Sequence, residues 1–408
     1  MDEKHYDQKR PGAVSLPPRR VLAGLVLAVC CIWRVSSQPA DLADARLDFW
    51  LPFRDAVEIP IGLADESGCV ECHEQAESFS LTGHARTLTR ATHPDSLAAL
   101  RQLKQTASAL AEGLRVELPS EETSSNAVRV TQSSGEEARS ELKLDWCFGS
   151  GEHARTWVGT LNDSWGATDL VEFRWTHFHA TGGFDVTPGQ VDSPPPGYFQ
   201  GLGVLYDAPK ARSCFACHAT SLTVSEGRLD AASLKPGVTC QRCHGSRQAH
   251  VDSEGKVGDS FWRTATQLES VNRCGQCHRR ADEQEPDTIT TDNVDMVRFQ
   301  PVGLVQSACF RGSPQMTCMT CHDPHRPLSA QDSLGIRQCV QCHDGAEGHD
   351  PFCGAGHRDD CLRCHMPKIQ SRRPVEFTDH WIRIRRPDEI PPAASLPVKP
   401  APSSEKAK

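Results

Sequence analysis

The chain has 408 residues, of which 38% are hydrophobic and only 6% are aromatic, and its formal net charge at pH 7 is −9. This length is enough for two or three ordinary domains, but the low content of apolar side chains leaves little material for ordinary hydrophobic cores. The acidic balance argues against nucleic-acid binding, which would call for a basic patch.

The N-terminal segment has the features of an export signal. Residues 21–33, VLAGLVLAVCCIW, form an uncharged apolar run preceded by Arg10, Arg19 and Arg20. The run is shorter than the roughly 20 residues needed to span a bilayer and fits the apolar region of a secretory signal. We therefore expect residues 1–37 to be a signal peptide, with an uncleaved N-terminal anchor through 21–33 as the alternative. The mature protein is then periplasmic or otherwise exported.

A Cys-x-x-Cys-His unit occurs seven times in the sequence. Two thiols separated by two residues can add to the two vinyl groups of one porphyrin, and the adjacent imidazole then binds the iron. Zinc is the alternative, because Cys-x-x-Cys pairs also form tetrahedral sites, but zinc does not need a histidine directly after every pair. We therefore predict seven covalently attached c-type haems. The attaching cysteines and the proximal histidines are Cys69, Cys72 and His73; Cys214, Cys217 and His218; Cys240, Cys243 and His244; Cys274, Cys277 and His278; Cys318, Cys321 and His322; Cys339, Cys342 and His343; Cys361, Cys364 and His365.

Between the first and the second motif, the sequence predicts one helix and several strands. Asp95 and Ser96 are expected to cap a helix whose apolar residues recur at helical spacing up to Leu114. Strand and turn are expected around Val128 and Val130. In residues 169–179, DLVEFRWTHFH, polar and apolar side chains alternate as they do in a half-buried strand.

The spacing of the motifs predicts the domain organisation. Six motifs fall between residues 214 and 365, which is too little chain per haem for independent folding units. We expect a mainly α fold with much irregular structure and a haem-filled core, plus a small β-containing insert. The predicted divisions are 1–37, signal peptide or anchor; 38–115, first-haem region; 116–212, β-containing insert; 213–385, six-haem domain; and 386–408, a disordered Pro-rich tail.

Further histidines are available as second axial ligands of the irons. His325 follows His322 by three residues and His250 follows His244 by six, so neither can easily reach the opposite face of the same macrocycle, and each is expected to bind a neighbouring haem. With His84 and His380 they form the set of expected distal ligands. His93 is a weaker candidate, because the following Pro94 suggests a loop or a helix-entry role for it. Additional distal candidates are His153, His177, His179, His349 and His357.

Three cysteines remain outside the motifs and the N-terminal segment. They are Cys147, Cys309 and Cys353. The sequence leaves two alternatives open, a Cys309–Cys353 disulfide and buried free thiols.

Several stretches resemble a known family. "ECHEQAESFSLTGHARTL", "GSGEHARTWVG", "GVTCQRCHGSRQAH", "MTCMTCHDPH", "CLRCHMPK" and "FTDHWIRI" resemble exported multihaem cytochromes with a cytochrome c-552/c-554 domain, which are related to hydroxylamine oxidoreductase. The resemblance covers most of residues 66–384. It implies closely packed haem pairs, irons with two histidine ligands, and distal roles for His84, His250, His325 and His380.

Two functions follow as expectations. The first is electron transfer through bis-histidine haems, with a membrane quinol-linked donor and a terminal reductase or another cytochrome as redox partners. The alternative is a multihaem reductase or oxidase of a small nitrogen or sulfur compound at one five-coordinate haem. Enzymatic relatives use a Cys-x-x-Cys-Lys motif or a cross-linked tyrosine; the sequence has no such lysine motif, and neither Tyr198 nor Tyr206 matches locally. The resemblance therefore favours the electron carrier.

Overall fold

The computed structural model describes ten stretches of the chain. They are residues 63–120, 127–134, 138–160, 170–191, 201–206, 208–225, 228–331, 334–345, 360–370 and 374–390. All of them belong to the second of two compact units, which begins at Ala45. The predicted signal segment 1–37, its apolar run 21–33 and most of the predicted C-terminal tail lie outside the described residues.

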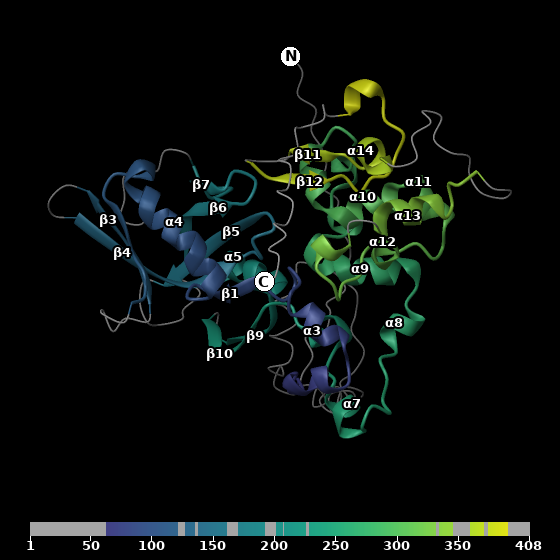
Figure 1. The fold of residues 1–408 in the computed structure, drawn as a ribbon, viewed down its shortest axis with the longest axis horizontal. Helices are drawn as coiled ribbons and strands as arrows, with labels where there is room; N and C mark the ends of the chain where they lie inside the picture. The colour runs from purple at the N-terminus through teal and green to yellow at the C-terminus, as the bar shows by residue number, and fades with distance from the viewer. Residues whose placement is uncertain are drawn as a thin grey trace, which may run out of the picture. The chain divides into compact units, whose positions relative to one another are not determined.

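An eight-stranded antiparallel sheet forms the first half of the described chain (Figure 1). Six strands follow one another in the order β2-β3-β4-β5-β6-β7, while β1 pairs with β4 and β8 pairs with β6. The sheet is curled into a half-barrel. Its strands are β1 (Leu88–Arg90), β2 (Leu114–Glu117), β3 (Val128–Ser134), β4 (Ala138–Phe148), β5 (Ala154–Thr160), β6 (Leu170–Phe178), β7 (Gly183–Val186) and β8 (Gly203–Leu205).

Helix α4 (Pro94–Leu110) packs against this sheet. Its residues Leu100 and Leu103 are fully buried, and they share a core with Val128, Val130 and Trp157. Complete burial of a leucine side chain contributes about 1.5–3 kcal/mol. The sheet and α4 therefore form a conventional hydrophobic core of their own.

The helix was expected to be capped by Asp95 and Ser96, and this expectation was wrong. The N-cap is His93, whose ring Nδ1 accepts a hydrogen bond from the backbone N–H of Asp95, with Pro94 in the first turn. Ser96 is buried, and its hydroxyl accepts a hydrogen bond of 2.8 Å from the Trp157 indole. The cap was misplaced because the polar pair at 95 and 96 resembles a cap in sequence, while a fixed proline φ already places the helix start at Pro94.

Strand β6 has the expected alternation of residue types, but neither face is open to solvent. Arg174 and Thr176, on the more polar face, are buried. The Arg174 guanidinium donates to the carbonyl of Val191, and the Thr176 hydroxyl is hydrogen-bonded to Thr156 and Thr187. A buried polar face is stable only because these groups have partners.

The expected mainly α fold with a small β insert is therefore wrong. The sheet is a major part of the fold, and it draws β1 and the start of β2 from the region assigned to the first haem. Periodicity alone missed this sheet because β1, β7 and β8 are only three or four residues long. The proposed division into domains stays a prediction.

The second half of the described chain consists of short helices and turns (Figure 1). The helices are α5 (Ala208–His218), α6 (Cys240–His244), α7 (Gln248–Asp252), α8 (Phe261–Thr264), α9 (Gln267–His278), α10 (Gln300–Gln306), α11 (Ala308–Gly312), α12 (Cys318–Cys321), α13 (Leu334–Val340) and α14 (Cys361–His365). Helix α3 (Gln75–Phe79) and the 3-10 turn η2 (Ser67–Glu71) precede the sheet. Later 3-10 turns are η3 (Ala281–Glu283), η4 (Pro286–Thr288), η5 (Val294–Arg298), η6 (Leu328–Ala330) and η7 (Pro387–Glu389).

Two strand pairs accompany these helices, β9 (Ala219–Ser225) with β10 (Arg228–Pro236) and β11 (Lys368–Gln370) with β12 (Glu376–Thr378). After residue 239, the buried hydrophobic side chains of the described residues are few: Val271, Val297, Val302, Leu304 and Phe310. Side chains alone make a thin core here, as expected where a large apolar group completes the interior. None of the helices in the described stretches has the length and apolar character that a membrane span requires.

Candidate haem-binding site

Each Cys-x-x-Cys-His motif lies on a helical turn. In the first, fifth and sixth motifs, the histidine N–H donates to the carbonyl of the first cysteine, as in His73 to Cys69 at 2.9 Å. Such a turn brings residues three and four apart to one side. It therefore presents both thiols and the imidazole together, as attachment of one porphyrin requires.

Four motif histidines each lie beside one of the four expected distal histidines. The ring centroids are 6.0 Å apart for His73 and His250, 6.1 Å for His84 and His278, 6.2 Å for His244 and His325, and 6.2 Å for His322 and His380. His325 therefore lies beside the histidine of the third motif, and His250 beside that of the first.

This spacing matches two imidazoles on opposite sides of one metal ion. An imidazole nitrogen binds a metal at about 2 Å, and the ring centroid lies about 1.1 Å further away, so two axial rings have centroids roughly 6 Å apart. Aromatic rings in direct contact also have centroids about 4.5–7 Å apart, and a metal between the rings is favoured because every pair contains the histidine of a Cys-x-x-Cys-His motif. The paired rings thus leave room for an iron between them.

The hydrogen bonds of the rings leave one nitrogen available for that metal. Ring Nδ1 is engaged in most of the paired histidines: His250 with Val257 O at 2.8 Å, His278 with Gln300 Oε1 at 3.2 Å, His244 with Asp259 Oδ2 at 2.7 Å, His325 with Asp323 Oδ1 at 3.2 Å and His380 with Thr378 O at 2.8 Å. A bond that fixes Nδ1–H orients the ring and exposes Nε2 as the ligand atom.

The surrounding protein alters the acidity of His84 and His380. Burial, with the nearby histidines of other motifs, lowers the pKa of His84 to about 4. Burial likewise lowers the pKa of His380 to about 4. Both rings nevertheless keep accessible surface. Neutral imidazoles that keep accessible surface are suited to binding a metal-containing group.

The cysteines of different motifs also meet. The side chains of Cys69 and Cys240, of Cys217 and Cys277, and of Cys274 and Cys318 lie next to each other. In addition, Cys339 of the sixth motif interacts electrostatically with Cys361 and Cys321. Adjacent cysteines thus link the first motif to the third, and the fourth motif to the second and the fifth. The third and fourth motifs, the fifth and sixth, and the sixth and seventh are linked by electrostatic interactions, the third and fourth through Cys243 and Cys274.

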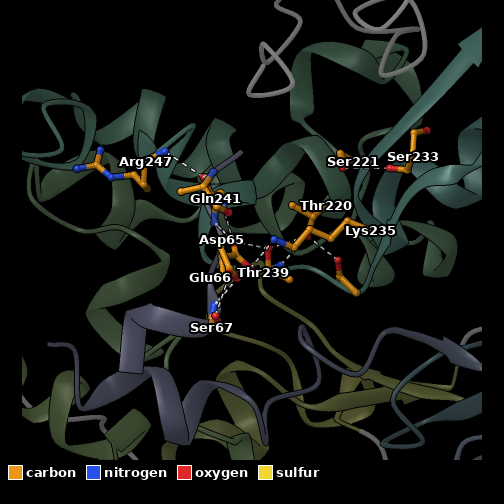
Figure 2. A network of polar contacts seen from close by, with 12 residues as sticks. Asp65, Glu66, Ser67, Thr220, Ser221, Ser233, Lys235, Thr239, Gln241 and Arg247 are labelled. Atoms are coloured by element: carbon orange, nitrogen blue, oxygen red, sulfur yellow. Dashed lines mark hydrogen bonds and ion pairs between the residues drawn. The ribbon is translucent and has the colours of Figure 1, made fainter. Parts of the chain in front are cut away.

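A polar network holds the first motif against the third (Figure 2). The Glu66 carboxylate accepts hydrogen bonds from the Thr239 hydroxyl at 2.8 Å and from the backbone and side-chain nitrogens of Gln241, and it forms an ion pair with Lys235 at 2.8 Å. Burial would raise the pKa of Glu66, but these bonds together bring it below its ordinary value. The charged carboxylate thus fixes the entry to the first motif.

The remaining candidate ligands of the sheet have other contacts. His177 is buried, its Nε2 meets the Gln102 amide oxygen at 3.2 Å, and its ring packs against Phe184. The His153 ring packs against Phe377 at 5.4 Å, and His179 is exposed. His349 and His357 lie outside the described residues.

The spare cysteines show no disulfide within the described chain. Cys147 is buried in the sheet core as a thiol, with its pKa raised to about 12 by burial. Cys309 is a free, partly buried thiol. Cys353 lies outside the described residues, so the Cys309–Cys353 alternative stays a prediction.

The described residues also contain no group of three or more His, Cys, Asp or Glu side chains placed to hold a metal ion as zinc would require.

Several supporting residues were missed from the sequence. Asp259, Thr87 and Glu66 have no local signature, because their partners lie elsewhere in the chain. The Thr87 carbonyl meets His218 Nδ1 at 2.9 Å. Asp323 could have been predicted from the sequence "CHDPH", since an aspartate between two candidate histidine ligands can reach the ring of either one.

Comparisons with known proteins agree with this site. Residues 202–245, which contain the second and third motifs, match the family model of cytochrome c554 and c-prime. That family implies covalently bound c-type haem. No curated protein matches the chain.

Two solved structures are similar to the chain. The outer cell wall cytochrome OcwA has 15% sequence identity and a TM-score of 0.50, over 80% of both chains. The undecahaem cytochrome from the S-layer of Carboxydothermus ferrireducens has 15% identity and a TM-score of 0.41, over 79% of this chain and 52% of that chain. The family match and the fold shared with OcwA confirm the resemblance of this chain to multihaem c-type cytochromes.

Proposed function

We propose that the chain is an exported heptahaem c-type cytochrome that passes electrons from a respiratory donor to a terminal acceptor. The observation that carries the proposal is the set of four histidine pairs at 6.0–6.2 Å. Bound haem iron supplies reversible one-electron oxidation and reduction. The chain supplies the two thiols, the proximal histidine and, in these four cases, a second histidine.

The second histidine favours electron transfer over catalysis. Two strong nitrogen ligands fill both axial positions and keep an iron low-spin, so that no position stays open for a substrate. Because Nδ1 of most paired rings is already hydrogen-bonded, the ligands are held in place in both oxidation states. Little rearrangement then accompanies each transfer.

The contacts between cysteines support a continuous path. Cys217 and Cys277 join the second motif to the fourth, and Cys274 joins the fourth to the fifth through Cys318. Attachment points that touch keep the attached groups close to one another. Seven motifs connected in this way favour transfer along the chain, with the first and last motifs as exchange points for redox partners.

The proposed partners follow from this role. A quinol-linked membrane protein would supply electrons, and a terminal reductase or another cytochrome would accept them. The basic residues and apolar run before residue 37 support export to the periplasm or beyond. The N-terminal sequence of the secreted protein tests this part directly.

A second candidate function concerns the haem of the second motif. The His218 ring packs edge-on against Phe148 at 5.1 Å, and no described histidine lies across from it at the spacing of the four pairs. The Tyr206 hydroxyl next to this motif donates to Glu172 at 2.9 Å and lies 3.6 Å from Cys214 Sγ. An open iron beside groups that carry protons would suit reduction of a small nitrogen or sulfur compound.

Low-temperature EPR of the oxidised protein, with haem counted by the pyridine haemochrome assay, tests both functions. The electron-carrier proposal predicts seven haems and low-spin signals from at least four of them. A high-spin signal that shifts on addition of nitrite or hydroxylamine would support the second candidate. Fewer than four low-spin centres would contradict the main proposal.

A further inference from the structure

The His244–His325 pair differs from the other three pairs in the partners of its rings. Asp259 Oδ2 lies 2.7 Å from His244 Nδ1, and Asp323 Oδ1 lies 3.2 Å from His325 Nδ1. In the other pairs, the acceptors of Nδ1 are neutral: backbone carbonyls for His250 and His380, and the Gln300 amide for His278. Among the contacts of the described residues, this is the one pair with a carboxylate behind both imidazoles.

Both aspartates are held in position by their own contacts. The Asp323 carboxylate also accepts a hydrogen bond from the backbone N–H of His325, and the buried Gln331 side chain bonds to the backbone of Asp323 on both its N–H and its carbonyl. The carbonyl of Asp259 accepts a hydrogen bond from Arg263 Nε at 2.9 Å. The Asp323 carboxylate is thus held independently of the His325 ring, and the backbone of Asp259 is fixed beside His244.

A carboxylate on Nδ1–H draws the proton toward itself and makes the imidazole a stronger donor to the metal. A stronger, more negative ligand stabilises ferric iron relative to ferrous iron. Reduction also adds one electron close to two negative charges, which is unfavourable. The guanidinium of Arg273 interacts with Asp259 and offsets part of one charge, but it does not replace the direct bond to the ring.

We propose that the haem of the third motif, bound between His244 and His325, is the lowest-potential centre of the four paired haems, and that Asp259 and Asp323 set this potential as positioning residues. This inference rests on the proposed bis-histidine electron transfer. The third motif touches the first motif through Cys240 and Cys69 and lies near the fourth through Cys243 and Cys274. A low-potential centre at this place would give up its electron readily to either neighbour.

The test is a potentiometric titration of the purified holoprotein with dithionite and ferricyanide in the presence of mediators, followed by EPR and visible spectra. Asp259→Asn and Asp323→Asn keep the size of each side chain and remove its charge. In each variant, the lowest midpoint potential among the bis-histidine low-spin components should shift to a higher value, and the double variant should show the largest shift. Asp259→Glu, which keeps the charge, should restore part of the low potential.

Glu254→Gln is the matched control. Glu254 is a strongly exposed carboxylate, its side chain 88% accessible, so this change alters net charge without touching a ligand. It should leave the lowest midpoint potential unchanged. The inference is overturned if neither aspartate variant moves that potential, or if Glu254→Gln moves it equally. If Asp259→Asn fails to assemble haem, the more exposed Asp323 decides the question.

The failure of this inference and that of the proposed function are distinguishable. Wild-type protein with bis-histidine low-spin signals but no shift in the aspartate variants contradicts only the role of Asp259 and Asp323. Wild-type protein without such signals contradicts the electron-carrier proposal itself.

Discussion

The imidazole rings of His84 and His278 stand almost at right angles, with an interplanar angle of 82° and centroids 6.1 Å apart. In the other three pairs, the angle between the rings is 18° or 33°. Two parallel imidazoles would donate into the same one of two iron d orbitals, so the energies of the two orbitals would differ. Two perpendicular imidazoles would each donate into a different one of these orbitals, so the two energies would stay nearly equal. The angle between the two imidazole rings should therefore determine the shape of the EPR signal.

We expect the EPR spectrum of the oxidised protein to contain two kinds of low-spin signal. The near-parallel pairs should give rhombic signals, and the His84–His278 pair should give a strongly anisotropic signal with a large maximal g value. His84→Ala should remove the anisotropic signal and produce a high-spin one. Loss of a rhombic signal instead would show that His84 belongs to a different iron.

His93→Ala is the matched control for His84→Ala. His93 caps α4, and its loss should cost about 1 kcal/mol of stability because the N–H of Asp95 loses its acceptor. It should leave every low-spin signal in place. A change of the haem signals in this variant would mean that EPR reports general damage to the fold rather than ligand loss.

The position of His380 depends on close packing against α10. A Cβ atom added at Gly303 would lie 2.6 Å from the backbone nitrogen of Trp381 and 2.9 Å from the carbonyl carbon of His380. Gly303→Ala should therefore push the His380 segment away and convert the centre shared with His322 from low-spin to high-spin. In Gly312→Ala, the new Cβ would have no atom within 4 Å, and the visible and EPR spectra should match those of the wild type.

The Glu66 network should make stability depend on pH. The pKa of Glu66 in the folded protein lies below its ordinary value of 4.5, so its charge contributes stability that is complete above pH 4.5 and is lost as the pH falls through the folded pKa. Glu66→Gln should lower the unfolding free energy by about 1–3 kcal/mol at pH 7. Denaturant unfolding at several pH values should show this difference shrinking in acid; a constant difference would contradict the account.

Destabilisation of the sheet core should leave the ligands of the haem sites in place. Leu103 is fully buried against the sheet, so Leu103→Ala should cost about 2–5 kcal/mol of unfolding free energy. Thr106→Ala, at an exposed position on the same helix, should cost far less. Both variants should keep the haem spectrum of the wild type when folded, and a lost low-spin signal in Leu103→Ala would show that the sheet positions a ligand.

The haem-attachment residues and the fold around them depend on different kinds of information. Local spacing predicts the thiols and proximal histidines, because attachment of one porphyrin requires that spacing. The choice of His84, His250, His325 and His380 came from the supply of histidines and a family resemblance. It did not show that His84 would lie beside His278, since no local pattern encodes a contact between such distant segments.

The sheet was underestimated for a related reason. Its edge strands are short and its long strand β6 is buried on both faces, so alternation along one segment could not reveal eight paired strands. Asp259 is likewise ordinary in sequence and acquires its role only when folding brings it to His244. Both the sheet and the role of Asp259 depend on contacts between residues distant in sequence, which a local sequence pattern does not contain.

The most direct test of the central claim is to locate the iron atoms in crystals of the haem-loaded protein by anomalous scattering at the iron absorption edge. The account predicts an iron peak between the two rings in each of the four pairs, with Nε2 of His84, His250, His325 and His380 as ligand atoms. An iron peak whose sixth position is empty or filled by another residue at any of these pairs would contradict it.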